Sequence, residues 1–443
     1  MKKVLILGAG MVAGPIAHYL LDNNFNVTIA SRTQAKAEKI ISSRQGGTAL
    51  SWTIDNTGLL DKLIAEHDIT VSLLPAEHHV EVARHCLEHK KNLVTTSYVS
   101  AEMQNLHANA QQAGVLFLNE IGVDPGFDHM TAKRIIDKVH ENGGKINEFY
   151  SLYGALPAPE EANNPFGYKF SWPPRGVLKA SNNGATFLKN NEVVEIPTEN
   201  LFKNPLKIDF PEVGNMEVYP NRNSLHYVGH YGIPEARTVY MGTFRHPHWC
   251  EAMDVIKSLG LLSHEIQNFE GKNFKEVVSE KIGVYPKNVK EKLAGTLNLE
   301  LDHPAIIALD WLGYFDNNMI NLKEGSTFDL TAMLMLQKMM LPGEARDMVV
   351  MLHFFLIENS KGEKEVIRSR MLYFSTAGNT SIARTVALPA AVAVKLILNG
   401  EINNTGVQIP VIKSIYEPVL DELEALGIKM NEEWGLPESA KLN

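Results

Sequence analysis

Cysteine is almost absent from this chain of 443 residues, in which only Cys86 and Cys250 occur, far apart in the sequence. So few cysteines exclude a disulfide framework, and we expect a protein of the reducing cytoplasm. An excess of positive charge is also lacking, because the formal net charge is -9. General nucleic-acid affinity needs a basic surface, so no nucleic-acid partner is expected.

Long hydrophobic runs are scarce as well. The opening MKKVLILGAG imitates a signal peptide, but its apolar run ends at the first glycine, too short for an h-region or a membrane span. No other apolar stretch approaches spanning length. The hydrophobic content of 44% is that of an ordinary globular protein. We therefore expect a compact chain without a membrane partner, and its length favours two domains over one.

The first part of the chain alternates short apolar runs with amphipathic segments, which is typical of βαβ units and a parallel sheet. One predicted helix has Ser100 as its N-cap and Gly114 just past its end. This pattern predicts a parallel α/β domain over residues 1–125. The expected buried strands are 3–7, 26–30, 69–75, 92–97 and 115–120.

From about residue 146 the pattern changes to long strands and hairpins. One hairpin is expected to turn at Asn190–Asn191, and a second joins two apolar strands across the polar stretch NSKGEKE. These features predict an inserted α+β domain with a mainly antiparallel sheet over residues 126–375, covered by helices near 250–260 and 330–341. Residues 376–443 are predicted to be helical, kinked or divided at Pro389, and to pack back on the first domain.

A glycine-rich turn opens the first domain. LILGAGMVAGPIAHYLL places Gly8, Gly10 and Ala13 in the G-x-G-x-x-G/A pattern, between a strand and a helix. Gly8 permits a tight turn, Gly10 lets backbone N–H groups approach a pyrophosphate, and Ala13 lets helix and strand pack closely. The alternative is a strand–helix turn without a ligand. Four further strands at the expected spacing favour a Rossmann-type domain that binds a dinucleotide.

The acid that usually ends the second strand of such a domain is missing. That acid accepts hydrogen bonds from the ribose 2′-OH and would repel a 2′-phosphate. Here the sequence has Ser31, Arg32 and Thr33, which offer hydroxyl groups, backbone donors and a planar cation. The combination favours NADP over NAD. The alternative is an arginine that is merely solvated at a strand end.

NEIGVDPGFDHM, residues 119–130, lies where the last predicted strand leaves the sheet. Ligands of open α/β sheets bind at the carboxyl ends of strands, so Asp124 is well placed for chemistry. Pro125 and Gly126 predict a sharp turn, and Asp128 is a candidate cap for the following helix. Taken alone, this motif leaves open whether Asp124 reacts or only stabilises the turn.

Longer motifs indicate a family. VTTSYVS, NEIGVDPGFDHM, LPAPEEANNPFGYKFSWPPRGVL, YPNRNSLHY, MGTFRH and ARTVALPAAVAVKLILNG resemble the saccharopine dehydrogenases, in particular the glutamate-forming branch, also called saccharopine reductase. The resemblance runs nearly end to end. It implies a homodimer with a split Rossmann domain and an inserted catalytic and dimerisation domain. It also implies the oxidation of saccharopine to glutamate and 2-aminoadipate semialdehyde, or the reverse reductive condensation.

The resemblance also assigns residues position by position. The positions implied to hold NADP are Gly10, Met11, Val12, Ala13, Ser31, Arg32, Thr33, Asp55, Leu74, Ser97, Val123, Asp124, Pro125 and Ser171. Those implied to contact the substrate are Ser97, Tyr98, Asp124, Arg222, Thr243 and Arg245. Saccharopine carries three carboxylates and two amines, which suits two arginines and an acid. Each arginine alone is more often a surface or ion-pair residue.

One stretch departs from the family. Where the family usually reads SYCGGLPAP, this chain reads SLYGALPAP, so Tyr153 replaces a cysteine and Ala155 a glycine. The larger side chains either narrow the pocket or supply the Tyr153 hydroxyl for proton transfer.

Saccharopine oxidation needs a base, because the secondary amine must be neutral before hydride leaves the neighbouring carbon. Asp124, Tyr98 and Tyr153 are the candidates for proton handling. Two other functions remain open at this point. One is a related imine reductase such as a carboxynorspermidine dehydrogenase, and the other is a regulator that binds NADP without turnover.

No metal is expected. The histidine-rich stretches EHHVEVARH and RHPHW lack a cysteine or carboxylate pattern that would complete a ligand set. His78 and His79 are sequence neighbours and point in different directions on a helix. His246 and His248 share a face on a strand, but two ligands make a poor site. Structural or solvent-exposed histidines are therefore expected.

Overall fold

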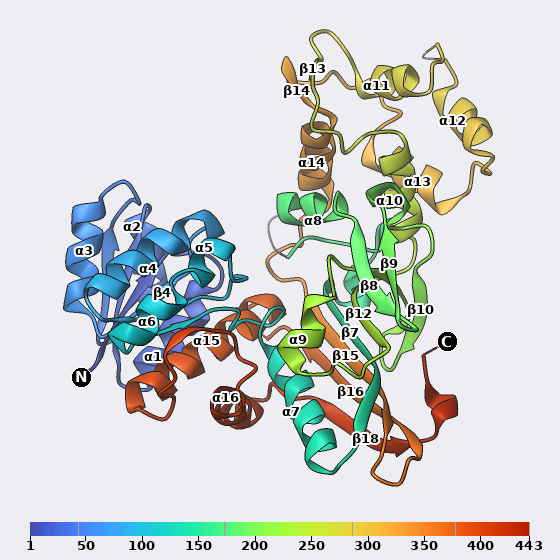
Figure 1. Ribbon diagram of the computed structural model, residues 1–443. Coiled ribbons are helices and arrows are strands. Elements are labelled where there is room, and N and C mark those ends of the chain that lie inside the picture. Colours follow the sequence, from blue (N-terminus) through green and yellow to red (C-terminus); the bar gives the residue numbers. More distant parts are fainter. Residues whose placement is uncertain (43, 172–173, 286, 377, 443) are drawn as a thin grey trace. The chain divides into compact units, whose positions relative to one another are not determined.

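The computed structural model describes residues 1–42, 44–171, 174–285, 287–376 and 378–442 (Figure 1). The chain forms two compact units, each built from segments that are not contiguous in sequence. Unit 1 comprises Met1–Gly143 and Asn379–Asn431, and unit 2 comprises Gly144–Gly378 and Glu432–Asn443.

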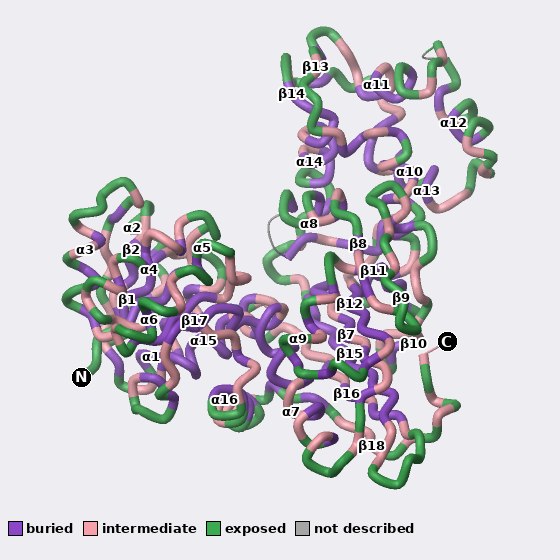
Figure 2. The backbone as a smooth tube through the Cα atoms, in the orientation of Figure 1, coloured by how far each residue is buried: buried purple, intermediate pink, exposed green. Residues whose placement is uncertain are grey.

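Unit 1 contains a seven-stranded parallel sheet in the order β17-β6-β5-β4-β1-β2-β3. This is the strand order of a doubly wound dinucleotide-binding fold with one extra edge strand, and it confirms the predicted fold class. Val4 to Leu7 of β1 are fully buried, as expected for a parallel sheet with helices on both faces (Figure 2). The strands are β1 (Lys3–Leu7), β2 (Asn26–Ser31), β3 (Gly47–Ser51), β4 (Ile69–Ser72), β5 (Asn92–Val94), β6 (Leu116–Leu118) and β17 (Gly406–Gln408).

The helices of unit 1 follow the strands of the sheet. The predicted helix beginning after Ser100 is divided in two, yet both predicted ends are confirmed: the Ser100 hydroxyl accepts from Met103 N, and Gly114 ends the second part at φ 71°. The helices are α1 (Ala13–Asp22), α2 (Gln34–Ile41), α3 (Thr57–Glu66), η1 (Ala76–His78), α4 (His79–Glu88), α5 (Ala101–Gln104), α6 (His107–Ala113), α7 (Phe127–Glu141), α15 (Ser381–Asn399) and α16 (Lys413–Ala425).

Helix α15 corrects one expectation drawn from the sequence. It runs unbroken through Pro389 for 19 residues and, by length and composition alone, is apolar enough to cross a membrane. No apolar stretch of that length is expected from the sequence pattern. However, 72% of its most apolar window is buried inside the structure, and it packs against α1 and α16. These contacts are those of a core helix.

Unit 2 is built on a nine-stranded mixed sheet. Strands β7 and β12 pair in parallel, whereas the pairs β10–β11, β11–β12, β8–β12, β8–β9, β7–β15 and β15–β16 are antiparallel, as predicted for a mainly antiparallel sheet. Asn190 and Asn191 turn the β8–β9 hairpin with φ values of 53° and 67°, which confirms that prediction. The strands are β7 (Lys145–Pro157), β8 (Ala185–Lys189), β9 (Glu192–Ile196), β10 (Leu206–Phe210), β11 (Gly214–Pro220), β12 (Thr238–Arg245), β15 (Asp347–Glu358), β16 (Lys364–Phe374) and β18 (Asn431–Leu436).

Helices and a two-stranded sheet complete unit 2. Helices α10 and α14 lie in the two regions where covering helices were predicted, and their buried side chains join one large core cluster with the sheet. The elements are η2 (Pro159–Glu161), α8 (Pro174–Ser181), η3 (Thr198–Asn200), α9 (His226–Tyr231), α10 (Trp249–Ser258), β13 (Ile266–Asn268), α11 (Phe274–Lys281), α12 (Val289–Leu297), α13 (Pro304–Leu312), β14 (Glu324–Ser326), α14 (Thr327–Lys338) and η4 (Glu438–Ala440).

The limits of the units differ from the predicted ranges 1–125, 126–375 and 376–443. Helix α7 belongs to unit 1, where it packs against α16. Residues 379–431 also belong to unit 1, where they add α15, α16 and strand β17. The end of the chain then returns to unit 2, where β18 pairs with β16.

Candidate functional site

The predicted residues of unit 1 gather at one edge of its sheet. All strands of this sheet are parallel, so the loops that follow them meet at their carboxyl ends. The strand order of the sheet reverses between the adjacent strands β1 and β4. Open sheets of this kind bind their ligands at the carboxyl ends of the strands on either side of such a reversal. The predicted residues follow β1 (Gly8 to Ala13), β2 (Arg32, Thr33, with Ser31 as its last residue), β3 (Asp55), β4 (Leu74), β5 (Ser97, Tyr98) and β6 (Val123 to Pro125).

The glycine turn has the geometry that a pyrophosphate needs. Gly8 has φ +109°, and a Cβ there would lie 3.2 Å from Leu73 O, whereas a Cβ on Gly10 would meet nothing within 4 Å. The backbone at Gly10 is therefore open to a ligand. Helix α1 begins just after this turn, at Ala13, with no acidic side chain in its first turn, so its positive end is not neutralised. These residues fit a dinucleotide phosphate.

The segment after β2 is exposed and cationic. Thr33 N donates to Ser31 Oγ at 3.4 Å, which folds the short loop around the Arg32 backbone. The Arg32 side chain is exposed, and within the described residues no ion pair holds its guanidinium. Its planar donors therefore remain available to a phosphate.

Asp124 lies in a tightly bonded loop. Gly122 N donates to Pro125 O, and Phe127 N donates to Gly122 O at 2.8 Å. Gly126 has φ 142°, and a Cβ there would lie 2.3 Å from Gly122 N, so no other residue fits this turn. The prediction that Asp128 caps helix α7 is wrong, because Gly126 is the N-cap and Asp128 lies in the first turn; its carboxylate instead holds the turn by accepting from Gly126 N at 2.6 Å.

Two of the predicted proton-handling residues are in contact. The Tyr98 hydroxyl donates to Asp124 Oδ1 at 3.2 Å, although 26 residues separate them in sequence. Both side chains are half-buried. Their loops are joined by two further bonds, from Val99 N to Glu120 Oε1 and from Glu120 N to Ser97 O. This contact forms because β5 and β6 are neighbours in the sheet.

Behind this loop lies a buried ionic cluster that the sequence did not reveal. His129 Nε2 lies 3.0 Å from Glu120 Oε2, and its Nδ1 lies 3.8 Å from Asp128 Oδ2. Burial alone would lower the pKa of the His129 imidazole, but the charges of Asp128, Glu120 and Asp124 together raise it. A cationic imidazole at this position stabilises the negative charge of Asp124 and fixes the loop.

A second histidine orients Ser97. His79 Nε2 lies 2.8 Å from Ser97 Oγ and its Nδ1 lies 2.8 Å from Ser72 Oγ. Burial lowers the pKa of the buried His79 to about 4, so the imidazole is neutral near pH 7. The sequence predicts a structural or solvent-exposed histidine at position 79, without a contact to the site. Nothing in its local pattern predicts one, because the contact depends on how α4 packs on β5.

In unit 2, strand register brings predicted residues together across the sheet. Thr243 of β12 pairs with Tyr219 of β11 on one side and with Tyr153 of β7 on the other. Tyr153 in turn pairs with Met351 of β15. Paired residues share a face of the sheet, so these side chains form one row. Tyr153, the residue that departs from the family pattern, is therefore a neighbour of Thr243.

Arg245 is a buried cation among aromatic rings. Its guanidinium lies 5.0 Å from the Tyr168 ring centre, 5.5 Å from Tyr219 and 5.2 Å from Trp249. It donates to Phe244 O at 2.8 Å and to the Tyr219 hydroxyl at 3.1 Å, yet only 5% of the residue is exposed. Its Nε is buried without a partner in the described part of the chain, and no carboxylate there forms an ion pair with it.

Arg222 has a different setting. It is exposed, has φ 55°, and its carbonyl accepts from Thr186 N at 2.7 Å. Arg222 lies two residues beyond Pro220, the last residue of β11, whereas Arg245 lies within β12 and pairs with Glu217 of β11. Arg245 therefore belongs to the paired strands and Arg222 to the loop that follows β11. The remaining predicted residue, Ser171, is buried with no partner for its hydroxyl in the described residues.

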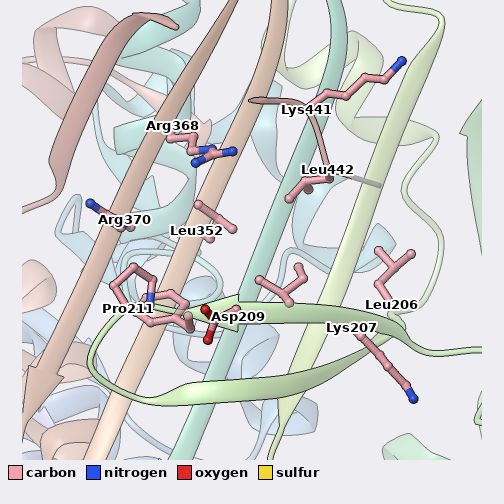
Figure 3. A pocket seen from close by; sticks show the side chains of 11 residues that line it. Leu206, Lys207, Asp209, Pro211, Leu352, Arg368, Arg370, Lys441 and Leu442 are labelled. Carbon is pink, nitrogen blue, oxygen red and sulfur yellow. The ribbon is translucent and has the colours of Figure 1, made fainter. Parts of the chain in front are cut away.

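A cavity in unit 2 lies away from these residues (Figure 3). Its volume is about 230 Å³, and Leu352, Arg368 and Arg370 line it from β15 and β16. Lys207 and Lys441 extend away from the other lining side chains. Leu352 alternates with Met351 along β15 and so points to the face opposite Tyr153. The cavity is therefore not the site predicted from the sequence.

Comparisons with known proteins agree with this arrangement. Residues 4–118 match the saccharopine dehydrogenase NADP binding domain, and residues 122–428 match the saccharopine dehydrogenase C-terminal domain. A saccharopine dehydrogenase (NADP(+), L-glutamate-forming) of Pyricularia oryzae is 36% identical over 97% of this chain and 98% of its own. The apo saccharopine dehydrogenase (L-Glu forming) of Saccharomyces cerevisiae has a TM-score of 0.91 at 33% identity, covering 98% of this chain and 100% of that one.

A carboxynorspermidine synthase of Vibrio cholerae is more distant, with 24% identity over 59% of this chain and 67% of its own. Similarity to the glutamate-forming dehydrogenases, in contrast, spans both units. The chain therefore belongs to the saccharopine dehydrogenase family, and its N-terminal region is the family's NADP-binding domain.

Proposed function

We propose that this chain is an NADP-dependent saccharopine dehydrogenase that forms L-glutamate and 2-aminoadipate 6-semialdehyde, or runs the reverse condensation. The observation that carries the proposal is the contact between Tyr98 and Asp124 at the carboxyl edge of a dinucleotide-binding sheet. The same edge holds the open glycine turn and the exposed Arg32. The full-length similarity to saccharopine dehydrogenases supports the substrate.

NADP would be held by Gly8 to Ala13 at its pyrophosphate and by Ser31, Arg32 and Thr33 at its 2′-phosphate. Asp55, Leu74, Ser97, Val123 to Pro125 and Ser171 are proposed as further contacts. When bound, NADP accepts the hydride that leaves the carbon next to the secondary amine of saccharopine.

Asp124 is proposed to accept the proton of that amine. The amine must be neutral before hydride leaves, and a carboxylate within hydrogen-bond reach performs this step. Tyr98 Oη already donates to Asp124 Oδ1, which orients the other oxygen toward a substrate. The resulting imine is hydrolysed by water, which again requires proton transfer. Tyr98 and Tyr153 are the hydroxyl groups proposed to assist.

The substrate carboxylates are assigned to the arginines of unit 2. Arg245 is buried and enclosed by aromatic rings, so its desolvated guanidinium would bind a carboxylate strongly. Arg222 is exposed and would bind a second carboxylate more weakly. Thr243, next to Tyr153 in the sheet, supplies a hydroxyl.

The decisive experiment is a spectrophotometric assay of NADP+ reduction with saccharopine as the only substrate. Turnover with saccharopine and none with carboxynorspermidine supports the proposal. Turnover with carboxynorspermidine alone would replace it with the related imine reductase. Tight NADP binding with no turnover of either compound would indicate the regulatory protein.

The family resemblance also leads us to propose a cytoplasmic homodimer that acts without a membrane or nucleic-acid partner. Both cysteines are buried and free, which is compatible with a reducing compartment. Light scattering of the purified chain tests the dimer directly, because a monomeric mass at micromolar concentration would contradict it.

A further inference from the structure

Two histidines and two carboxylates converge on the surface of unit 1 between helices α3 and α4, which pack against each other (Figure 1). Asp61 lies on α3. His85 and Glu88 lie in the last turns of α4, and His89 follows at its end. These residues just precede β5, whereas the predicted cofactor residues follow the strands. The cluster is therefore at the opposite edge of the sheet from that site.

The distances within this cluster are those of a ligand set. Asp61 Oδ1 lies 3.2 Å from His85 Nδ1 and 2.7 Å from His89 Nε2. One ligand atom each from Asp61, His85 and Glu88 lies within 4.8 Å of the other two. In a tetrahedral zinc site with bonds of about 2.0–2.1 Å, neighbouring ligand atoms are about 3.3 Å apart. Only small side-chain movements would therefore bring these atoms around one ion.

The residue types select the metal. Imidazole nitrogen with carboxylate oxygen is a donor set for Zn²⁺ and similar transition ions, whereas Mg²⁺ and Ca²⁺ prefer oxygen alone.

An outer carboxylate supports the same assignment. Glu81 Oε1 lies 3.6 Å from His85 Nε2, the ring nitrogen that faces away from Asp61. A carboxylate behind a ligand histidine fixes the ring orientation and raises the basicity of the coordinating nitrogen. An ordinary surface pair lacks this arrangement. His248 and Glu251 are also 3.2 Å apart, but they are a single pair without further ligands.

We propose that Asp61, His85 and Glu88 bind one Zn²⁺ ion, with His89 bonded to Asp61 beside this set, and that the ion thereby joins α3 to α4 in the cofactor-binding unit. The sequence had suggested no metal because its histidine stretch contains no complete ligand pattern. The missing ligand, Asp61, comes from the preceding helix, 24 residues away from His85. The ion would have a structural role and is independent of the proposed saccharopine chemistry.

The test uses the untagged, metal-stripped full chain, titrated with Zn²⁺ by calorimetry in a buffer free of chelating ions. We expect one Zn²⁺ per chain, with an increase in Tm and no comparable binding of Mg²⁺. Asp61→Asn and His85→Gln should each weaken Zn²⁺ binding by at least tenfold. Glu81→Gln should weaken it by about 10–100-fold if Glu81 orients His85. The matched control His248→Gln should leave it unchanged.

Cobalt gives a second measurement that does not depend on variants. Bound Co²⁺ should show the intense visible absorption of a tetrahedral N/O site, and Zn²⁺ should displace it. Absence of stoichiometric Zn²⁺ binding would overturn the proposal. So would binding that survives both Asp61→Asn and His85→Gln, or six-coordinate Co²⁺ spectra.

Discussion

In unit 1 the candidate residues stand in loops at one edge of a parallel sheet, whereas in unit 2 they lie along paired strands and against the core. Arg32 is exposed and held only by its own short loop. Arg245 is 5% exposed and surrounded by three aromatic rings. A loop residue can change its ligand without disturbing the fold, but a core residue cannot. Cofactor preference should therefore be easier to alter than substrate preference.

The largest effect is expected at Asp124, which is half-buried and in contact with Tyr98. Asp124→Asn keeps the shape and the Tyr98 contact but removes the basicity. If Asp124 accepts the amine proton, kcat should fall by ~10²–10⁴ and the acidic limb of the pH–rate profile should disappear. Steady-state kinetics across pH measure both effects. A raised KM with an intact pH profile would show instead that Asp124 only orients the amine.

Arg245 tests whether a core residue of unit 2 can have a binding role. Arg245→Met removes the charge but keeps much of the packing among the rings, so the fold should persist. Loss of one partner from a buried charge pair costs ~2–5 kcal/mol, so the substrate KM should rise at least about 30-fold. NADP affinity should be unchanged.

Arg222→Ala is the matched variant for Arg245→Met. It should also raise KM, but less, because Arg222 is exposed and solvent screens its pair. An unchanged KM in Arg245→Met would remove Arg245 from the site and leave it a core residue.

Protonation of His79, which contacts Ser97 at the carboxyl edge of the sheet, is expected to lower the stability of the folded chain. Its folded-state pKa of about 4 lies below the ordinary value of 6.5, so protonation favours the unfolded chain. Stability should fall as the pH drops below about 6.5, by roughly 3 kcal/mol once the pH reaches 4. His79→Gln should lose less stability than the parent over this range in thermal unfolding series. His78→Gln, at the neighbouring position outside the core, should follow the parent.

Arg32 should show the smaller effect expected of an exposed loop residue. Arg32→Asp replaces a charge-assisted contact with repulsion, so NADP affinity should fall about tenfold while NAD affinity changes little. Cofactor titrations followed by fluorescence measure both. Equal losses of the two cofactors would mean that Arg32 does not discriminate between them.

Substitution of Tyr153 should give the smallest change in kcat. It tests whether this side chain only fills space or also transfers a proton. If its hydroxyl only fills space beside Thr243, Tyr153→Phe should change kcat by less than about threefold. Tyr153→Cys, which restores the residue that the family usually carries, should then widen the range of accepted substrates. A fall of ~10² in kcat for Tyr153→Phe alone would identify the hydroxyl as a proton donor.

The two units also differed in how far the sequence could predict them. Strand ends in unit 1 are marked by glycine, proline and apolar runs, and parallel order places every such end at one edge. The positions of Gly8, Arg32 and Asp124 followed from that rule. The Tyr98–Asp124 contact could not be derived from it, because it required knowing that β5 and β6 are neighbours.

In unit 2, the proximity of Tyr153 to Thr243 depends on the register of a parallel pair separated by about ninety residues, and local patterns contain no information about register. The family resemblance supplied Thr243 and Arg245, but not the burial of Arg245. The clusters at His79, His129 and Asp61 were missed for the same reason. Each combines side chains from different elements whose packing the sequence does not state.

The path of the chain between the units has a consequence for synthesis. Unit 1 lacks β17, α15 and α16 until residue 431 is made, and unit 2 lacks β18 until residue 436. An N-terminal domain usually folds while later residues are still being added. Here neither unit is complete until residues 431–436 have been made, so the earlier segments of both units keep apolar surface exposed until then. The nascent chain is therefore expected to depend on chaperones, and a stop codon shortly before residue 400 would leave both units unfinished.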